Sequence, residues 1–119
     1  MKRILIVDDE DMIVDVLGRM LGRLGHSFAA ADSGNAGIRR FLEGVYDLVL
    51  LDVLLPDIDG FQIAKEMRKH HADQRIVMVT GLSRETVYGR MRAEGIFVDG
   101  VLAKPFTVDH VASLVQSMG

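Results

Sequence analysis

Five short apolar runs alternate along this chain with segments whose apolar residues recur at helical spacing. The runs occupy residues 3–7, 27–31, 48–51, 76–79 and 100–103. Strands and helices that alternate in this way build a parallel sheet with right-handed crossover connections. The sequence therefore predicts an α/β fold, a doubly wound five-stranded parallel sheet with five helices. We expect the strand order 2-1-3-4-5, because this order places the first and third strands side by side at the topological switch point.

The third apolar run is the most informative of the five. Leu48 to Leu51 are consecutive apolar residues, which suit a strand that is buried on both faces. Asp52 follows them, and a turn rich in aspartate extends from Pro56 to Gly60. Functional groups of open α/β sheets lie outside the carboxyl ends of the strands. We therefore expect the Asp52 carboxylate at the rim of a crevice.

The intervening segments predict five helices of unequal quality. Ser33, Ser83 and Thr107 stand where the second, fourth and fifth helices begin, and the two serines are suitable N-caps. The second helix is expected to bury Ile38, Phe41, Leu42 and Val45, and the fifth Val108, Val111, Leu114, Val115 and Met118. The fourth helix has a sparse apolar stripe and contains Gly89, which costs roughly 1 kcal/mol relative to alanine. It is a candidate moving part.

Composition excludes several functions. The 119 residues suit one domain over residues 1–119, and the net charge of -3 argues against direct nucleic-acid binding. The chain has no cysteine, which excludes disulfides, thiol catalysis and thiolate metal sites. The first apolar run is too short for a signal peptide or a membrane span, so we expect a cytoplasmic protein.

Polar residues follow four of the five predicted strands. They are Asp8 and Asp9, Asp52, Thr80, and Lys104. Three converging carboxylates repel one another and favour a bound cation, and oxygen ligands with an open position suit Mg²⁺ or Mn²⁺. A cation, a lysine and a hydroxyl donor around one carboxylate are suited to phosphoryl transfer, in which Asp52 would attack in line while Mg²⁺ and Lys104 neutralise the phosphoryl oxygens.

The whole chain resembles the receiver domain of the bacterial two-component response-regulator family, whose chemotaxis-regulator-like members have the flavodoxin-like fold. The matching residues are Asp8 and Asp9; Asp52 with Pro56 and Gly60; Thr80 with Gly81; and Lys104 with Pro105. The resemblance implies that Asp52 accepts a phosphoryl group from a sensor histidine kinase or phosphotransfer protein. It also implies that Asp9, Asp52 and the Leu54 carbonyl bind Mg²⁺ directly, that Asp8 acts through water, and that the Lys104–Pro105 bond is cis.

The sequence departs from the family pattern at Val101. The family usually has an aromatic residue three positions before the lysine, which reports the state of the threonine; with Val101, we expect the loop after Thr80 and the fourth helix to transmit the change. The resemblance implies that the side chains of Leu54 and Leu82, two residues after Asp52 and Thr80, lie over the phosphoryl group. Neither leucine can orient a water for attack, so we expect slow dephosphorylation.

Alternative functions remain to be weighed. A docking module that acts independently of phosphorylation is supported by Val101. Flavodoxin-like FMN binding and an aspartate-nucleophile phosphatase both fit poorly with the acidic residues after the first strand. A receiver catalyses its own modification, so its status as an enzyme is marginal. The downstream protein partner or attached effector domain, the monomeric or phosphorylation-dependent dimeric state, and the free-standing or excised origin of the chain are left open.

Several acidic and basic residues have simpler interpretations. Asp57 and Asp59 are expected to be turn residues, and Glu10 and Asp11 to favour the start of the first helix through its dipole. The fourth helix, last strand and last helix are the expected partner surface. Its candidate contact residues are Arg84, Tyr88, Arg90, Arg92 and His110.

Overall fold

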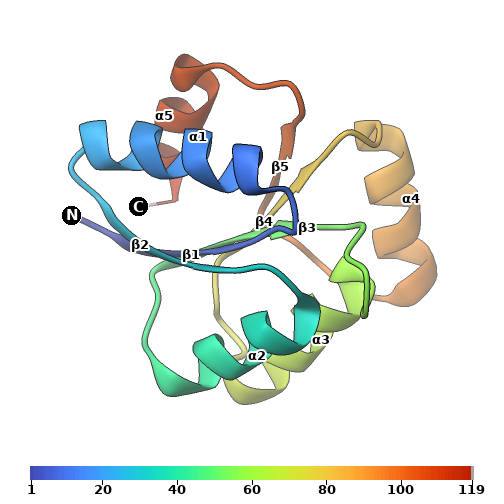
Figure 1. The fold of residues 1–119 in the computed structure, drawn as a ribbon. Coiled ribbons are helices and arrows are strands. Elements are labelled where there is room, and N and C mark those ends of the chain that lie inside the picture. Colours follow the sequence, from blue (N-terminus) through green and yellow to red (C-terminus); the bar gives the residue numbers. More distant parts are fainter. Residues whose placement is uncertain (119) are drawn as a thin grey trace.

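The computed structural model describes residues 1–118 and contains five strands and five helices in strict alternation (Figure 1). The elements are β1 (Arg3–Val7), α1 (Asp11–Arg23), β2 (Ser27–Ala31), α2 (Gly34–Glu43), β3 (Leu48–Asp52), α3 (Gly60–His70), β4 (Ile76–Thr80), α4 (Arg84–Glu94), β5 (Gly100–Ala103) and α5 (Val108–Ser117). The predicted number and order of elements are confirmed. Within the described residues, no helix is long and apolar enough to cross a membrane.

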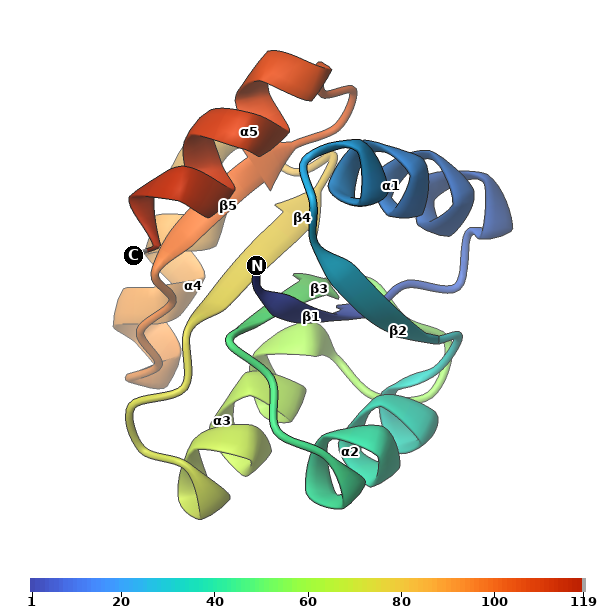
Figure 2. The ribbon, with the colours of Figure 1, turned by 90° about the vertical axis from the view of Figure 1, so that its left-hand side faces the viewer.

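The strands form one parallel sheet in the order β2-β1-β3-β4-β5, as predicted. Figure 2 shows β2 and β5 at opposite edges. The register places Val7 opposite Leu51, and Thr80 opposite Ala103. The carboxyl ends of the inner strands are therefore level with one another, so that the residues after them meet at one edge.

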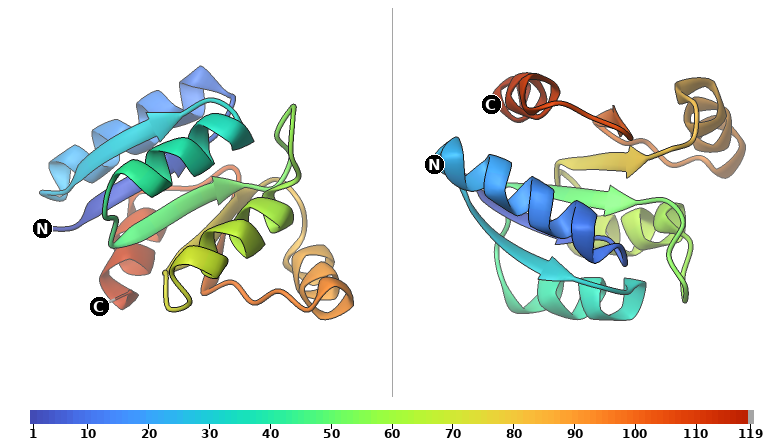
Figure 3. Two further views of the ribbon diagram at one scale, coloured as in Figure 1. Left: turned by 90° about the horizontal axis from the view of Figure 1, so that it is seen from below. Right: turned by 45° about the horizontal axis from the view of Figure 1, so that its top comes forward.

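Two layers of helices cover the sheet. α1 and α5 pack on one face over Ile6, Leu50 and Val79, whereas α2, α3 and α4 pack on the other over Val7 and Leu51 (Figure 3). All five β3 residues are buried, which confirms the expectation of a central strand covered on both faces. Asp52 lies at the end of that strand, so the site is built on the most enclosed part of the fold.

Local sequence accounts for most helix boundaries. The hydroxyls of Ser33, Ser83 and Thr107 accept hydrogen bonds from the backbone N–H three residues later. Gly25 follows the end of α1 with φ +85°, a conformation that glycine adopts without steric cost. The helix starts predicted for α2 and α4 are therefore confirmed.

The apolar faces predicted for α2 and α5 included residues that the structure leaves exposed. α2 ends at Glu43, so Val45 lies in the following loop and is 79% exposed, and Leu42 is also exposed. Val108 is exposed in the first turn of α5. In α4 only Val87 is buried, as the sparse apolar stripe predicted. α4 is consequently the helix with the weakest apolar attachment to the sheet.

Candidate functional site

The strand register brings four polar residues to one edge of the sheet. Asp8 and Asp52 lie beside each other, because Val7 is paired with Leu51 immediately before them. Lys104 follows Ala103, whose partner in β4 is Thr80. Asp8, Asp52 and Thr80 are all buried, at 2%, 5% and 1% exposure. The parallel topology thus concentrates polar groups at a point where the surrounding chain is apolar.

The Asp52 carboxylate is held by one contact on each oxygen. Oδ1 accepts a hydrogen bond from the Leu54 N–H at 3.3 Å, and Oδ2 lies 3.5 Å from Lys104 Nζ. Burial, followed by the nearby Asp8 carboxylate, raises the pKa of Asp52 above its ordinary value, and Lys104 offsets part of the increase. A raised pKa means that the ionised form of Asp52 is less stable in this structure than it is in water.

The Lys104 ammonium joins three carboxylates. Its Nζ lies 2.9 Å from Glu10 Oε1, 3.0 Å from Asp8 Oδ2 and 3.5 Å from Asp52 Oδ2. Burial alone lowers the pKa of Lys104, but the hydrogen bond to Glu10 and the attraction of Asp8 and Asp52 outweigh it, so the pKa is raised. The group therefore carries its full positive charge. Glu10, expected only to favour the start of α1, is a member of the site that sequence reasoning missed.

One buried oxygen of Asp8 lacks a hydrogen-bond partner. Asp8 Oδ1 accepts from the Glu10 N–H at 2.9 Å. Asp8 Oδ2 accepts no hydrogen bond, since its 3.0 Å contact with Lys104 is an ion pair without hydrogen-bond geometry. Oxygens of Asp8, Glu10 and Asp52 all lie within 4.8 Å of one another. A buried oxygen that makes an ion pair but no hydrogen bond, beside other carboxylates, is suited to a hard divalent cation.

Asp9 is placed differently from its neighbours. Its side chain is exposed and lines a shallow groove together with Leu54 and Pro56, and it is not part of the cluster of close carboxylate oxygens. Its assignment as a direct metal ligand stays a prediction. Leu54 is 62% exposed beside Asp52, where its backbone N–H already contacts the carboxylate.

Thr80, Gly81 and Val101 were expected to form the switch. The Thr80 hydroxyl oxygen accepts a hydrogen bond from the Leu82 N–H at 3.1 Å, and its own hydrogen is free to be donated. A Cβ at Gly81 would meet no atom within 4 Å apart from those of its chain neighbours, so there is open space beside the backbone after Thr80. Val101 is buried in the same core cluster as Val87 of α4. Val101 therefore has the packing role of a core residue.

The loop after Asp52 is held at several points. The Gly60 N–H donates to the Val53 carbonyl at 2.8 Å, and a Cβ at Gly60 would lie 2.3 Å from the Asp52 carbonyl oxygen, so only glycine fits. Pro56 is exposed in this loop. The Lys104–Pro105 bond is cis, which confirms the implication of the resemblance.

Asp57 does more than form a turn. Its carboxylate accepts from the Gly34 and Asn35 N–H groups at 2.8 and 2.9 Å, so it binds the N-terminus of α2 across the fold. These hydrogen bonds, with Asn35 first and Gly34 second, lower the pKa of Asp57. The loop that follows the phosphoacceptor candidate is thereby attached to α2.

Asp59 attaches the same loop to α4. It caps α3 by accepting from the Phe61 N–H at 2.9 Å, and it binds both terminal nitrogens of Arg90, at 2.8 and 2.9 Å. The guanidinium also pairs with Glu94 and lies 4.5 Å from the centre of the Phe61 ring. Arg90 is therefore held by contacts within the domain, and its role as a partner contact stays a prediction.

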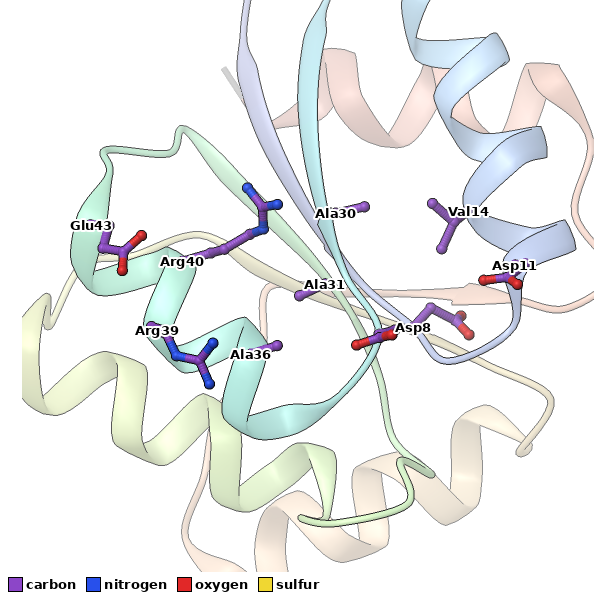
Figure 4. Close-up of a pocket in the computed structure, with 10 residues that line it drawn as sticks. Asp8, Asp11, Val14, Ala30, Ala31, Ala36, Arg39, Arg40 and Glu43 are labelled. Atoms are coloured by element: carbon purple, nitrogen blue, oxygen red, sulfur yellow. The ribbon is translucent and has the colours of Figure 1, made fainter.

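A separate groove of about 600 Å³ opens beside the site, between α1 and α2 (Figure 4). Asp8 and Asp11 lie on one side and Arg39 and Arg40 of α2 on the other, with the β2 alanines between them. Asp8 belongs to both the groove and the polar cluster, whereas Asp52, Thr80 and Lys104 do not line the groove. The groove therefore adjoins the polar cluster at Asp8 alone among these four residues.

The sheet order 2-1-3-4-5 is that of flavodoxin-like domains. At its carboxyl edge lie a buried carboxylate, a lysine, a threonine hydroxyl and a cluster of acidic residues that could bind a cation. Together these features define the class of flavodoxin-like signalling domains. The chain belongs to the response regulator receiver domain family, whose model matches residues 4–116. The resemblance seen in the sequence is confirmed. The domain is thus a phosphorylation-controlled signalling switch of the two-component type.

The relatives include a transcriptional regulatory protein and a sensor protein, and the chain matches a different share of each. Transcriptional regulatory protein DltR of Streptococcus agalactiae is 31% identical over 96% of this chain and 50% of its own length. Aerobic respiration control sensor protein ArcB of Escherichia coli is 31% identical over 95% of this chain and 14% of its own length. The crystal structure of response regulator protein TrrA from Thermotoga maritima, in complex with Mg(2+)-BeF, matches with 34% identity, a TM-score of 0.88 and complete coverage of both chains.

The chain spans half or less of the length of these two curated relatives. Their common part is the receiver fold, and the remainder of each relative has no counterpart in the 119 residues. What is shared is therefore the signalling module.

Proposed function

We propose that Asp52 accepts a phosphoryl group from a phosphohistidine of a sensor histidine kinase or phosphotransfer protein. A single observation carries the proposal: Asp52 is buried beside Asp8, and Lys104 Nζ lies 3.0 Å from Asp8 Oδ2 and 3.5 Å from Asp52 Oδ2. Burial next to a second carboxylate destabilises the ionised form of Asp52, and the single ammonium offsets this only in part.

The chain's own residues have separate roles in the transfer. An ionised oxygen of Asp52 attacks phosphorus and forms an O–P bond, while the P–N bond of phosphohistidine breaks and its electron pair leaves with the imidazole. Lys104 binds one phosphoryl oxygen through Nζ. Thr80, whose hydroxyl hydrogen is free, donates to another. Asp52, Lys104 and Thr80 are thus the catalytic residues of a self-modifying domain, and no separate substrate is turned over.

The acidic residues fit a resident Mg²⁺ or Mn²⁺. Asp8, Asp9, Asp52 and the Leu54 carbonyl are the proposed ligands, and the close oxygens of Asp8 and Asp52 support this set. When bound, the ion supplies positive charge that offsets the repulsion between the carboxylates and the phosphoryl oxygens.

We further propose that Thr80 and Gly81 transmit phosphorylation to α4, and that the output passes to a downstream partner or an attached effector domain. The open space at Gly81 and the single buried residue of α4 support this route. The domain would act in the cytoplasm, as a monomer or a phosphorylation-dependent dimer.

The decisive experiment is intact-mass spectrometry after incubation with acetyl phosphate and Mg²⁺, comparing the wild type with Asp52→Asn. We expect the wild type alone to gain one phosphoryl group, and chelation of Mg²⁺ to prevent the gain. Absence of the gain in both proteins would exclude phosphorylation at this site and favour a docking module independent of phosphorylation.

A further inference from the structure

Lys104 has closer partners than the carboxylate it is proposed to assist. Its Nζ is 2.9 Å from Glu10 Oε1 but 3.5 Å from Asp52 Oδ2. The hydrogen bond to Glu10 joins residues 94 positions apart in the sequence. In the structure, the ammonium is therefore bound by a residue that takes no part in the proposed transfer.

Glu10 is arranged so that its carboxylate is available to Lys104. It is the N-cap residue of α1, yet its side chain makes no capping hydrogen bond. Its backbone N–H is bound to Asp8 Oδ1 at 2.9 Å, which places the residue beside the site. The Glu10 side chain is 58% exposed, whereas that of Asp8 is 2% exposed. Of these two carboxylates, only that of Glu10 is already mainly exposed to solvent.

A phosphoryl group on Asp52 requires the same ammonium that Glu10 binds. The Glu10 oxygen also lies within 4.8 Å of oxygens of Asp8 and Asp52, so an anionic group that approaches Asp52 meets an additional negative charge. We propose that Glu10 is a positioning residue that holds Lys104 away from the phosphoryl position, and that an incoming phosphoryl group displaces it. The inference rests on the proposed function and deepens it, because Glu10 then sets how readily the site accepts a phosphoryl group.

The test compares Glu10→Gln with Asp11→Asn, which removes the same charge from the next, exposed position. Beryllofluoride binding at saturating Mg²⁺, followed by ¹⁹F NMR, reports the affinity of a phosphoryl mimic. Mn²⁺ binding without beryllofluoride, followed by EPR, reports the metal site itself. We expect Glu10→Gln to lower the half-saturating beryllofluoride concentration about fivefold, and Asp11→Asn to change it less than about twofold. We expect Mn²⁺ affinity to fall less than about tenfold in Glu10→Gln, which loses a nearby charge but no ligand, and less than about threefold in Asp11→Asn.

Three results would overturn the inference. Weaker beryllofluoride binding together with a tenfold or greater loss of Mn²⁺ affinity in Glu10→Gln would show that Glu10 supports the metal site instead of competing for Lys104. Equal effects of the two variants would indicate a general charge effect. Unchanged beryllofluoride affinity in Glu10→Gln would show that Glu10 does not compete for Lys104. Failure of the wild type to bind beryllofluoride, or binding that survives Asp52→Asn, would instead refute the proposed function.

Discussion

Replacement of Arg90 by glutamine should lower the free energy of local opening of α4. The effect should be far larger than that of neutralising any other charged residue of this helix. Arg90 binds Asp59 through two hydrogen bonds, and the two side chains are each 32% exposed. A bidentate pair at this depth contributes about 1.5 kcal/mol, between the ranges for exposed pairs and for buried charged hydrogen bonds. Contact with the Phe61 ring adds about 0.5 kcal/mol. The total of about 2 kcal/mol corresponds to a roughly 30-fold change in an equilibrium.

Hydrogen exchange measured by mass spectrometry is the appropriate assay, because it reports local opening. Peptides that cover α4 should exchange about ten- to thirtyfold faster in Arg90→Gln than in the wild type, whereas peptides from β1 and β3 should not change. Arg92→Gln is the matched control, since Arg92 is exposed on the same helix and forms no salt bridge within residues 1–118.

A double-mutant cycle isolates the pair from the other contacts of Arg90. Asp59→Asn removes the charge but keeps a side chain that can cap α3, because asparagine is as good an N-cap as aspartate. The coupling energy between Arg90→Gln and Asp59→Asn, from urea denaturation, should be about 1.5 kcal/mol. A coupling near zero, or equal exchange of α4 in Arg90→Gln and Arg92→Gln, would refute the conclusion that this pair anchors the helix.

Three further predictions concern the site and its loop. Asp57→Ala should lower the thermal unfolding midpoint at neutral pH; because the folded-state pKa of Asp57 is lowered, its contribution is lost as pH falls through that pKa, and the midpoints should converge in acid. Asp52→Asn should raise the midpoint at neutral pH in chelating buffer. The folded-state pKa of Asp52 is raised, so the wild type loses stability as pH rises through it, and the gain should vanish below the ordinary aspartate pKa. Leu54→Asn or Leu82→Glu should speed the decay of the phosphorylated protein in a mass-spectrometric time course, since a polar group can orient the attacking water; a fast decay in the wild type that neither variant alters would contradict this.

The sheet and the phosphoacceptor candidate could be predicted because both depend on local patterns. Consecutive apolar residues such as Leu48 to Leu51 indicate a central strand, and parallel topology then requires the residues after the strands to meet at one edge. No long-range contact had to be known. The position of Lys104 beside Asp52 follows from the same rule.

Glu10 and Arg90 could not be assigned in this way. Each has a sufficient local explanation, as a helix-start acid and as an exposed residue of a polar helix, and their real partners are distant in sequence. Val45 was wrongly assigned to the buried face of α2, because the helical spacing of apolar residues continues beyond the last residue of the helix. Periodicity locates a helix but does not determine where its hydrogen bonds stop.

The packing around the backbone differs between the loop that follows Asp52 and the loop that follows Thr80. On one side of Asp52 the chain has no clearance, since even a methyl group at Gly60 would overlap the Asp52 carbonyl oxygen. On the other side, the backbone at Gly81 has free space. The proposed movement of the β4–α4 loop agrees with this difference. We expect the backbone around Gly81 to shift on phosphorylation and the backbone at Gly60 to stay in place.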